Sequence, residues 1–409
     1  MFDSGTILLL WLKGWREGLH CSMEYKQMKS KLKIIRATTV PMSLNAFCNG
    51  MLKELSEKYE VVALSSPGVE FPAIEEREGV RTIKVPMERH ISIVKDLKAL
   101  IKMIGVFRKE KPTMVHSMTP KAGLLCMIAG WLTKVPVRVH TFTGMVWPTE
   151  KGLKRQILMM TDRLTCACAT HIIPEGEGVK SDLIAGKITN KPLKVLGYGN
   201  VKGVDLTHYV RSEELKVKSE KLHSDRFTFL FVGRIVKDKG INELCQAFDK
   251  LSKIAPVRLV LVGRYEDDLD PISDEAREMI KNNSSIEYVG PQYGDDLLSY
   301  YAAADCFVFP SYREGFPNTV LEAGAMGLPS IVTDINGSRE IIKQGENGVI
   351  VPSQNAEALY EAMQKMLINK EKREYMARNA RKMIANRFEQ GFVRKCLYDF
   401  YGEILQDIL

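Results

Sequence analysis

The stretch Ser311-Tyr312-Arg313-Glu314-Gly315-Phe316-Pro317-Asn318-Thr319-Val320-Leu321-Glu322 places two carboxylates eight positions apart. A strand-like apolar run at 305–310 precedes it, the first Glu lies in a loop with Gly and Pro, and the second lies just inside a helix predicted over 319–326. Backbone N–H groups at a helix start attract phosphate, and a carboxylate one turn further in can accept hydrogen bonds from a ribose. The stretch therefore suits a sugar nucleotide, although a helix N-terminal charge and a solvated side chain would also explain the spacing.

A second element upstream favours the ligand site. Residues 229–234, Phe-Leu-Phe-Val-Gly-Arg, are typical of a buried strand that ends in Gly-Arg, and a helical pattern follows from 241 to 250. Arg234 and Lys239 stand on either side of the intervening turn. Because open α/β sheets bind ligands at the carboxyl ends of their strands, we expect both cations to reach a diphosphate.

Further motifs occur in order along the second half of the chain. They are Val232-Gly233-Arg234 with Lys239-Gly240, Val260-Leu261-Val262-Gly263, Glu314-Gly315-Phe316-Pro317-Asn318 with Glu322, Gly337-Ser338-Arg339-Glu340-Ile341 and Gly345-Glu346-Asn347-Gly348. Together they resemble the retaining glycosyltransferases of the GT-B fold in the fourth glycosyltransferase family (glycosyl transferases group 1), of the bacterial surface-polysaccharide type. The resemblance is strong over 227–352 and looser over 33–205.

The length of 409 residues predicts two domains rather than one. Strand-like and helical segments alternate from residue 32 and again from 229, which is typical of an α/β protein with doubly wound parallel sheets. The resemblance implies two Rossmann-like domains that face each other across a cleft. The predicted division is an N-terminal extension (1–30), an acceptor domain (31–205), a nucleotide-sugar domain (206–387) and a helix that crosses back to the first domain (388–409).

Local patterns predict a turn over 41–45, a single helix over 47–59 and a polar helix over 212–221. The final helical pattern spans about 388–407.

The resemblance implies a role for four charged donor-site residues. Arg234 and Lys239 would bind the donor diphosphate and offset the negative charge that develops on the leaving group. Glu322 would accept hydrogen bonds from the ribose hydroxyls. Glu314 would hold hydroxyls of the transferred sugar, and it joins Arg234 and Lys239 as a catalytic residue.

The resemblance implies further donor contacts. Backbone N–H groups of Phe316, Asn318 and Thr319 would contact the sugar or the phosphates. Arg264 lies where the base could sit, or it is an ordinary surface cation. Uridine is the expected donor base, because it is the commonest one in polysaccharide assembly.

No metal ion or cofactor is expected. The adjacent acids at 267–268 and 295–296 lie in polar stretches typical of turns or helix N-caps, and no Asp-x-Asp pair stands at a strand edge. The resemblance implies metal-independent transfer with retention of configuration. The eight Cys have no Cys-x-x-Cys spacing, which favours a reduced, cytoplasmic protein.

On the acceptor side the chain departs from the family pattern. Residues 40–45 lack the two Gly that many relatives have near the donor phosphate, although the N–H of Ser43 could still point there. In the stretch 140–144, Thr143 stands where relatives have a His, so His140 is either a shifted sugar contact or a core residue. Lys121, at a helix start, either grips an acceptor phosphate or is solvated.

The charge is unevenly distributed, with 35 Lys and Arg against 23 Asp and Glu in residues 1–225, and 23 against 27 in the remainder. No nucleic-acid-binding motif accompanies the basic half, which favours an anionic membrane over nucleic acid. Basic amphipathic patterns over 91–111 and 151–163 could lie on such a membrane, or they are ordinary helices with a core-facing stripe. No segment is long and apolar enough to span a bilayer.

These observations predict a glycosyltransferase that moves a hexose-type sugar from a nucleotide sugar, UDP-linked, to a glycan or polyprenyl-diphosphate-linked acceptor. It would work in the cytoplasm, in peripheral contact with the inner membrane. The alternatives are a sugar-nucleotide epimerase of the same fold and a non-catalytic sugar-nucleotide-binding scaffold.

Overall fold

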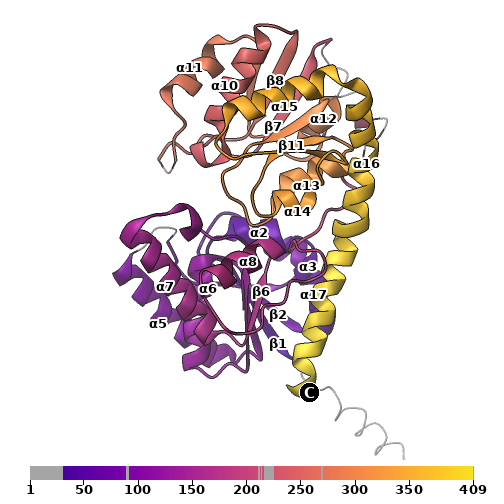
Figure 1. Ribbon diagram of the computed structural model, residues 1–409. Helices are drawn as coiled ribbons and strands as arrows, with labels where there is room; N and C mark the ends of the chain where they lie inside the picture. Colours follow the sequence, from indigo (N-terminus) through magenta and orange to yellow (C-terminus); the bar gives the residue numbers. More distant parts are fainter. Residues whose placement is uncertain are drawn as a thin grey trace, which may run out of the picture.

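The computed structural model describes residues 31–408 apart from 89–91, 211, 213, 216–224 and 269. The predicted extension over 1–30 and most of the predicted helix over 212–221 lie outside the described residues. Two lobes are stacked one above the other, and the last two long helices run down one side of both (Figure 1).

Each lobe is built on a six-stranded parallel sheet. In the first, the strand order is β3-β2-β1-β4-β5-β6, with bounds Lys33–Ala37 (β1), Glu60–Ser65 (β2), Arg81–Lys84 (β3), Met114–Ser117 (β4), Val137–Phe142 (β5) and His171–Pro174 (β6). In the second, the order is β12-β11-β10-β7-β8-β9, with bounds Phe227–Val232 (β7), Val257–Val262 (β8), Ile286–Gly290 (β9), Cys306–Phe309 (β10), Ser330–Thr333 (β11) and Gly348–Val351 (β12). The two doubly wound sheets confirm the predicted fold class.

Helices cover both faces of each sheet, which is why the central strands are apolar throughout rather than alternating. β10, for example, is buried at all of its positions. The helices of the first lobe are Pro41–Cys48 (α2), Met51–Lys58 (α3), Phe71–Glu78 (α4), Ile93–Glu110 (α5), Pro120–Leu132 (α6), Gly152–Cys168 (α7) and Glu177–Ala185 (α8), with the short turn Trp147–Thr149 (η1). Those of the second are Ile241–Ser252 (α10), Asp274–Asn282 (α11), Gly294–Ala303 (α12), Asn318–Ala325 (α13), Ser338–Ile341 (α14), Ala356–Ile368 (α15) and Lys370–Phe388 (α16), with the short turn Lys237–Lys239 (η2).

The segment after β1 differs from the prediction. The expected turn over 41–45 is wrong, because Pro41 occupies the first turn of α2, where its missing N–H is not needed. The single helix predicted over 47–59 is also wrong. Gly50 adopts a positive φ of 74°, and a new helix, α3, starts at Met51.

The C-terminal helix α17 (Gln390–Leu405), followed by the short turn Gln406–Ile408 (η3), returns to the first lobe. It packs in the same apolar cluster as α2, α3 and α4, whereas α5 to α8 pack on the opposite face of that sheet. The Glu389 carboxylate separates α16 from α17, since it accepts hydrogen bonds from the N–H groups of Gly391 and Phe392.

A buried polar group fastens α17 to the first sheet. The guanidinium of Arg36 on β1 donates to the Tyr401 hydroxyl and to His116 Nδ1 on β4. Burial, with the nearby charge of Arg36, holds the pKa of His116 well below its ordinary value. The neutral ring therefore accepts at Nδ1 and donates from Nε2 to Thr141 Oγ1, 2.7 Å away.

Replacing Tyr401 by Phe removes a hydroxyl that the buried guanidinium needs. Leaving a buried donor without its partner costs about 1–3 kcal/mol, so we expect Tyr401→Phe to lower the thermal unfolding midpoint. Tyr375→Phe on α16, where the ring is 49% exposed, is the matched control and should leave the midpoint unchanged. Equal midpoints for the two variants would contradict a stabilising role for this contact.

Candidate active site

Lys239 and Glu314 meet although they come from separate loops. Lys239 ends η2, after β7, and its ammonium forms an ion pair with Glu314 Oε1 in the loop after β10. Ser311 Oγ also donates to Glu314 Oε1, at 3.1 Å. Gly240 permits this approach, because a Cβ there would lie 2.1 Å from the carbonyl oxygen of Pro310. The expected convergence of a cation and an acid at the carboxyl ends of adjacent strands is therefore present for this pair.

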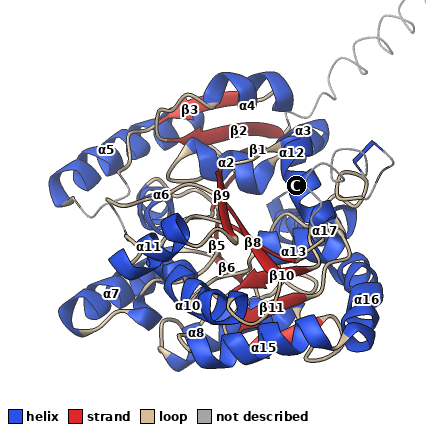
Figure 2. Cartoon of the chain, turned by 90° about the horizontal axis from the view of Figure 1, so that it is seen from above, coloured by secondary structure: helices blue, strands red, loops and turns tan. Residues whose placement is uncertain are grey.

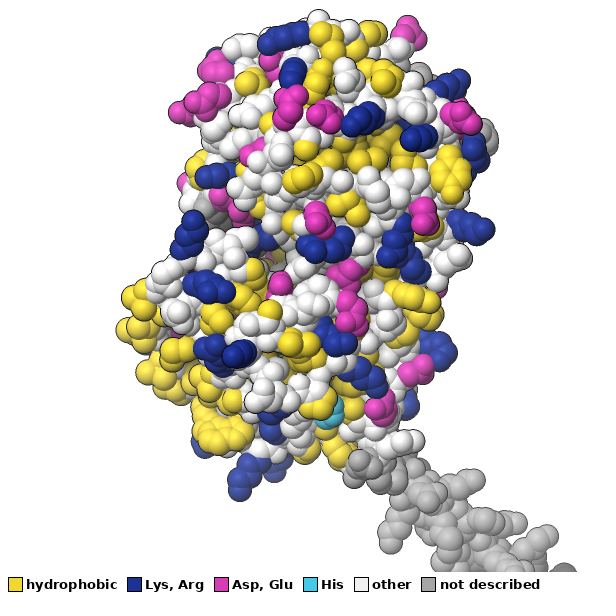
Figure 3. Space-filling view, viewed as in Figure 1, with side chains coloured by type: hydrophobic (Ala, Val, Ile, Leu, Met, Phe, Trp, Pro, Cys, Tyr) yellow, Lys and Arg dark blue, Asp and Glu magenta, His cyan; other side chains and the backbone are white. Residues whose placement is uncertain are grey.

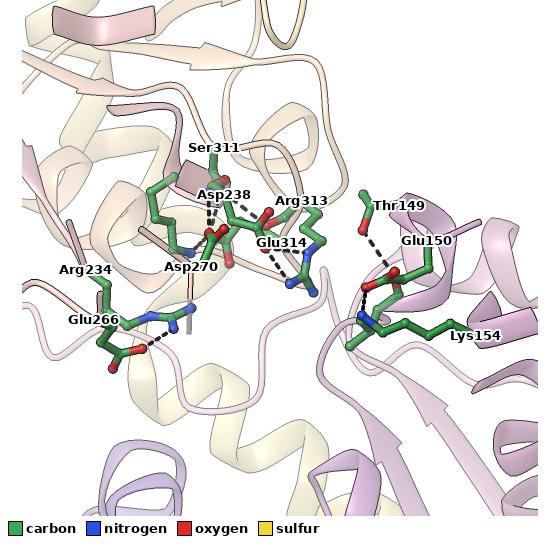
Figure 4. A network of polar contacts seen from close by, with 12 residues as sticks. Thr149, Glu150, Lys154, Arg234, Asp238, Glu266, Asp270, Ser311, Arg313 and Glu314 are labelled. Carbon is green, nitrogen blue, oxygen red and sulfur yellow. Dashed lines mark hydrogen bonds and ion pairs between the residues drawn. The ribbon is translucent and has the colours of Figure 1, made fainter. Parts of the chain in front are cut away.

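Arg234 lies beside this pair but has a different partner. Its Nη1 is 2.7 Å from Glu266 Oε2, in the loop after β8, and Arg264 Nη2 is 3.1 Å from Glu266 Oε1. Burial alone would raise the pKa of Glu266, but hydrogen bonding and the charges of Arg234 and Arg264 lower it. The close view shows the Arg234–Glu266 pair next to the loop of Glu314 (Figure 4).

Arg264 also reaches across the two lobes. Its Nη2 is 3.8 Å from Met42 Sδ on α2. Arg264, which was predicted to lie beside a donor base, is thus at the boundary between the lobes. Arg264 and Arg234 both pair with the carboxylate of Glu266.

The start of α13 lies directly after the Glu314 loop. Asn318 and Thr319 occupy its first two positions, where backbone N–H groups have no intrahelical acceptor. Asn318 Oδ1 accepts from Asn200 Nδ2 in the segment that joins the lobes, at 3.0 Å. Phe316 is buried against Phe388, with ring centroids 5.3 Å apart. This holds the loop between the second sheet and the connecting helices.

Glu322 lies deeper than the other predicted donor residues. Its side chain is 9% exposed. Tyr301 Oη donates to Glu322 Oε2 at 3.2 Å, and Lys202 Nζ is 3.5 Å from Oε1. In this state both carboxylate oxygens have protein partners.

The loop of Glu314 is pressed against the first lobe. A Cβ on Gly315 would lie 2.3 Å from the carbonyl oxygen of Thr143, and one on Gly144 would lie 3.0 Å from the Gly315 nitrogen. Thr143 Oγ1 donates to the Met118 carbonyl at 2.9 Å. Thr143 is therefore next to the Glu314 loop, as expected of an acceptor-side residue, but its backbone rather than its hydroxyl makes the contact.

The other predicted first-domain residues have structural partners. His140 is 2% exposed, its Nδ1 is 2.9 Å from Ser117 Oγ, and burial lowers its pKa to about 3. This geometry corresponds to the core alternative for His140. Lys121 is paired with Asp96 Oδ1 on α5 at 2.7 Å. The expectation that the N–H of Ser43 is available to a ligand is wrong, because it donates to the Val40 carbonyl in the first turn of α2.

Two carboxylates that the sequence reasoning did not assign lie where the lobes meet. Glu340 on α14 accepts from the N–H groups of Glu177 (2.7 Å) and Gly178 (3.1 Å) at the start of α8. Glu175, directly after β6, is buried, and its Oε1 has no hydrogen-bond partner. Burial, together with the charges of Glu314 and Glu340, raises the pKa of Glu175 well above its ordinary value. The sequence signal that could have identified Glu175 as a site residue is its position directly after a predicted strand.

No three or more His, Cys, Asp or Glu side chains in the described part of the chain gather in a way that could hold a metal ion. No described helix has both the length and the apolarity needed to cross a bilayer.

Two family profiles match successive parts of the chain, "Glycosyl transferase 4-like domain" over 45–199 and "Glycosyl transferases group 1" over 212–383. The chain is 34% identical over 379 residues to the capsular polysaccharide biosynthesis glycosyltransferase CapM of Staphylococcus aureus. This match covers 92% of this chain and 98% of that protein. This chain belongs to the glycosyl transferases group 1 family. The glycosyltransferase is also 28% identical over 319 residues to the UDP-Gal:alpha-D-GlcNAc-diphosphoundecaprenol alpha-1,3-galactosyltransferase of Escherichia coli, over 76% of this chain and 81% of that protein.

Solved structures share the GT-B fold of this glycosyltransferase. Anabaena HepE in complex with UDP-glucose matches with a TM-score of 0.74 at 17% identity, over 91% of this chain and all of that one (100%). A putative UDP-N-acetylglucosamine 2-epimerase from Listeria monocytogenes matches with a TM-score of 0.62 at 18% identity, over 90% and 94%. At these identities the matches show the fold alone, and the family assignment depends on the sequence matches.

The tight contact at Gly315 predicts that this position does not tolerate a side chain. Gly315→Ala should displace the Glu314 loop, and a misplacement of about 1 Å lowers turnover by about 100-fold. Gly105→Ala, on α5, is the control, since a Cβ there meets nothing within 4 Å. Initial rates of donor consumption test this, and equal rates for both variants would exclude the proposed close approach.

Proposed function

We propose that this glycosyltransferase is a retaining, metal-independent hexosyltransferase. It transfers a hexose-type sugar from a UDP-sugar to a glycan or polyprenyl-diphosphate-linked acceptor in surface polysaccharide synthesis, on the cytoplasmic face of the inner membrane. The observation that carries the proposal is the Lys239–Glu314 pair, which joins two ligand-facing loops of the second sheet beside the boundary between the lobes.

The cations have a direct chemical use in this reaction. As the C1–O bond to the diphosphate breaks, negative charge develops on the leaving phosphate oxygens. Lys239 and Arg234 both lie in the segment that follows β7 and can stabilise that charge. In doing so Lys239 would exchange its contact with Glu314, and Arg234 its contact with Glu266, for the phosphate oxygens. The first N–H groups of α13 add a positive helix end.

Glu314 and Glu322 would act on hydroxyl groups. Glu314, released from Lys239 by the diphosphate, can accept a hydrogen bond from a sugar hydroxyl. Glu322 can accept from the ribose once Lys202 gives way, because that contact is long, at 3.5 Å.

Transfer with retention balances without a protein base. The acceptor oxygen forms its bond to C1 on the face that the diphosphate leaves, and its proton passes to the departing phosphate oxygen. The contact of Gly315 with Thr143 keeps the lobes close around the reacting atoms, which excludes water. His140 has no step in this mechanism, since it is buried and bonded to Ser117.

The relatives support the choice of donor and acceptor. The Escherichia coli relative is named for a UDP-galactose donor and a diphosphoundecaprenol acceptor, and the HepE structure contains UDP-glucose. CapM is named for capsular polysaccharide biosynthesis.

Loss of the Lys239 ammonium should reduce the turnover number kcat. Removing one preorganised group that stabilises transition-state charge costs about 100-fold in kcat, so we expect Lys239→Ala to lose about that much with a UDP-sugar. Lys237→Ala, at an exposed position of the same turn, is the control. A Lys239→Ala variant within a few-fold of wild type would contradict the proposed role.

The anomeric outcome separates the proposal from its alternatives. A panel of UDP-hexoses incubated with a polyprenyl-diphosphate sugar should yield one glycosidic product, whose anomeric configuration by NMR equals that of the donor. An inverted product would reject retention. A donor converted to its epimer without acceptor would indicate an epimerase, and binding without turnover would indicate a scaffold.

A further inference from the structure

We infer that α5 and α7 form a docking surface for an anionic lipid bilayer, called here the α5–α7 surface. It is defined by the exposed apolar side chains of both helices, which are Ile93, Val94, Leu97, Ile101, Leu153, Ile157, Met160 and Leu164. The inference deepens the proposed function. Its link to the active site rests on the lipid-linked acceptor of that proposal.

The outer face of α7 is apolar where a solvated helix would be polar. Leu153, Ile157, Met160 and Leu164 recur at intervals of three and four and are 76%, 42%, 66% and 47% exposed. At about 100° per residue these four form one narrow stripe, while Met159 and its buried neighbours face the sheet. A stripe of this kind is normally covered by a partner.

α5 has two apolar faces rather than one. Ala99, Met103 and Phe107 are buried and face the sheet, as in any helix that covers a sheet. A second set projects into solvent beside them, with Ile93 82%, Leu97 56% and Ile101 63% exposed. From the sequence, the apolar pattern of α5 could be either a core-facing or a lipid-facing stripe. The helix has both a buried apolar stripe and a separate exposed one.

The two stripes lie on the same side of the molecule. α6 contacts both α5 and α7, and Figures 1 and 2 place α5 and α7 on one side of the first lobe. Hydrophobic side chains gather over this region in the space-filling view, with Lys and Arg between them (Figure 3). Trp131, at the end of α6, is 57% exposed as well and is the kind of side chain that sits at a membrane interface.

The charges beside the stripes favour lipid over a second protein copy. On α5 the exposed Lys95, Lys98 and Lys102 follow the apolar face, and on α7 Lys154 and Arg163 flank the stripe. Two of these cations have acid partners, since Lys95 pairs with Glu88 and Lys154 with Glu150. Among the described residues Lys98 and Lys102 form no ion pair, and Asp96 is paired with Lys121. A surface that is apolar in the middle and cationic at its edges is complementary to anionic headgroups, whereas two copies would bring like charges together.

The α5–α7 surface borders the candidate active site. Lys154 at the start of α7, with Thr149 and Glu150 just before that helix, lies opposite Arg313 and Glu314 in the close view (Figure 4). A bilayer on this surface would therefore place the boundary between the lobes near the headgroups. A lipid-linked acceptor could reach Glu314 with its hydrocarbon chain still in the membrane.

Vesicle flotation of the full chain tests the surface without any substrate. We expect binding to phosphatidylglycerol vesicles, weaker binding to phosphatidylcholine vesicles, and loss of binding as salt rises. Each large apolar side chain removed from the lipid should lower the partition coefficient by about tenfold, so Leu153→Ser with Met160→Ser should nearly abolish flotation. Ile254→Ser, 63% exposed in the second lobe, is the matched control and should float like wild type.

Other outcomes overturn the inference. No flotation of the wild type with anionic vesicles, or equal flotation of the double variant, would reject the lipid surface. A wild-type dimer in sedimentation velocity that the double variant dissociates would assign the same side chains to a second copy.

Activity assays separate this inference from the proposed function. Flotation without any sugar transfer leaves the α5–α7 surface standing and rejects the transferase proposal. Transfer to a water-soluble acceptor without flotation supports the transferase proposal and rejects the α5–α7 surface.

Discussion

The backbone contact between Gly315 and the Thr143–Gly144 segment is the constraint on which the rest of the site depends. It joins the loop of Glu314 in one lobe to the end of β5 in the other, at a distance that no side chain would permit. The Glu340 carboxylate at the start of α8 and the Asn200–Asn318 hydrogen bond add to the same boundary. The site is therefore formed by the meeting of the lobes and not by either sheet alone.

The charges at this boundary are matched in pairs within the protein. Lys239 is opposed by Glu314, and Arg234 shares Glu266 with Arg264. Each pair holds the cation in position and can exchange its carboxylate for a phosphate, because both are anionic acceptors of similar hydrogen-bond geometry. This arrangement keeps the cations ordered before a diphosphate binds, which lowers the entropic cost of binding it.

The two buried histidines of the first lobe have structural roles. His116 and His140 are buried and neutral, and they use their ring nitrogens to hold β4, β5 and α17 together. The apolar α5–α7 surface lies on the opposite side of that lobe from α17. The proposed catalytic charges therefore lie in the second lobe, and the proposed lipid-facing surface lies in the first.

The sequence by itself determined the alternation of buried strands and helices, and the placement of Arg234, Lys239 and Glu314 after strands of one sheet. These features depend on local periodicity and on the rule that parallel strands end at a common edge. Only the tertiary structure decided that Glu266 pairs with Arg234, that His140 is a core residue, and that the apolar stripe of α7 is exposed rather than packed against another described segment. These outcomes depend on which distant segments pack together, and a local pattern carries no information about that.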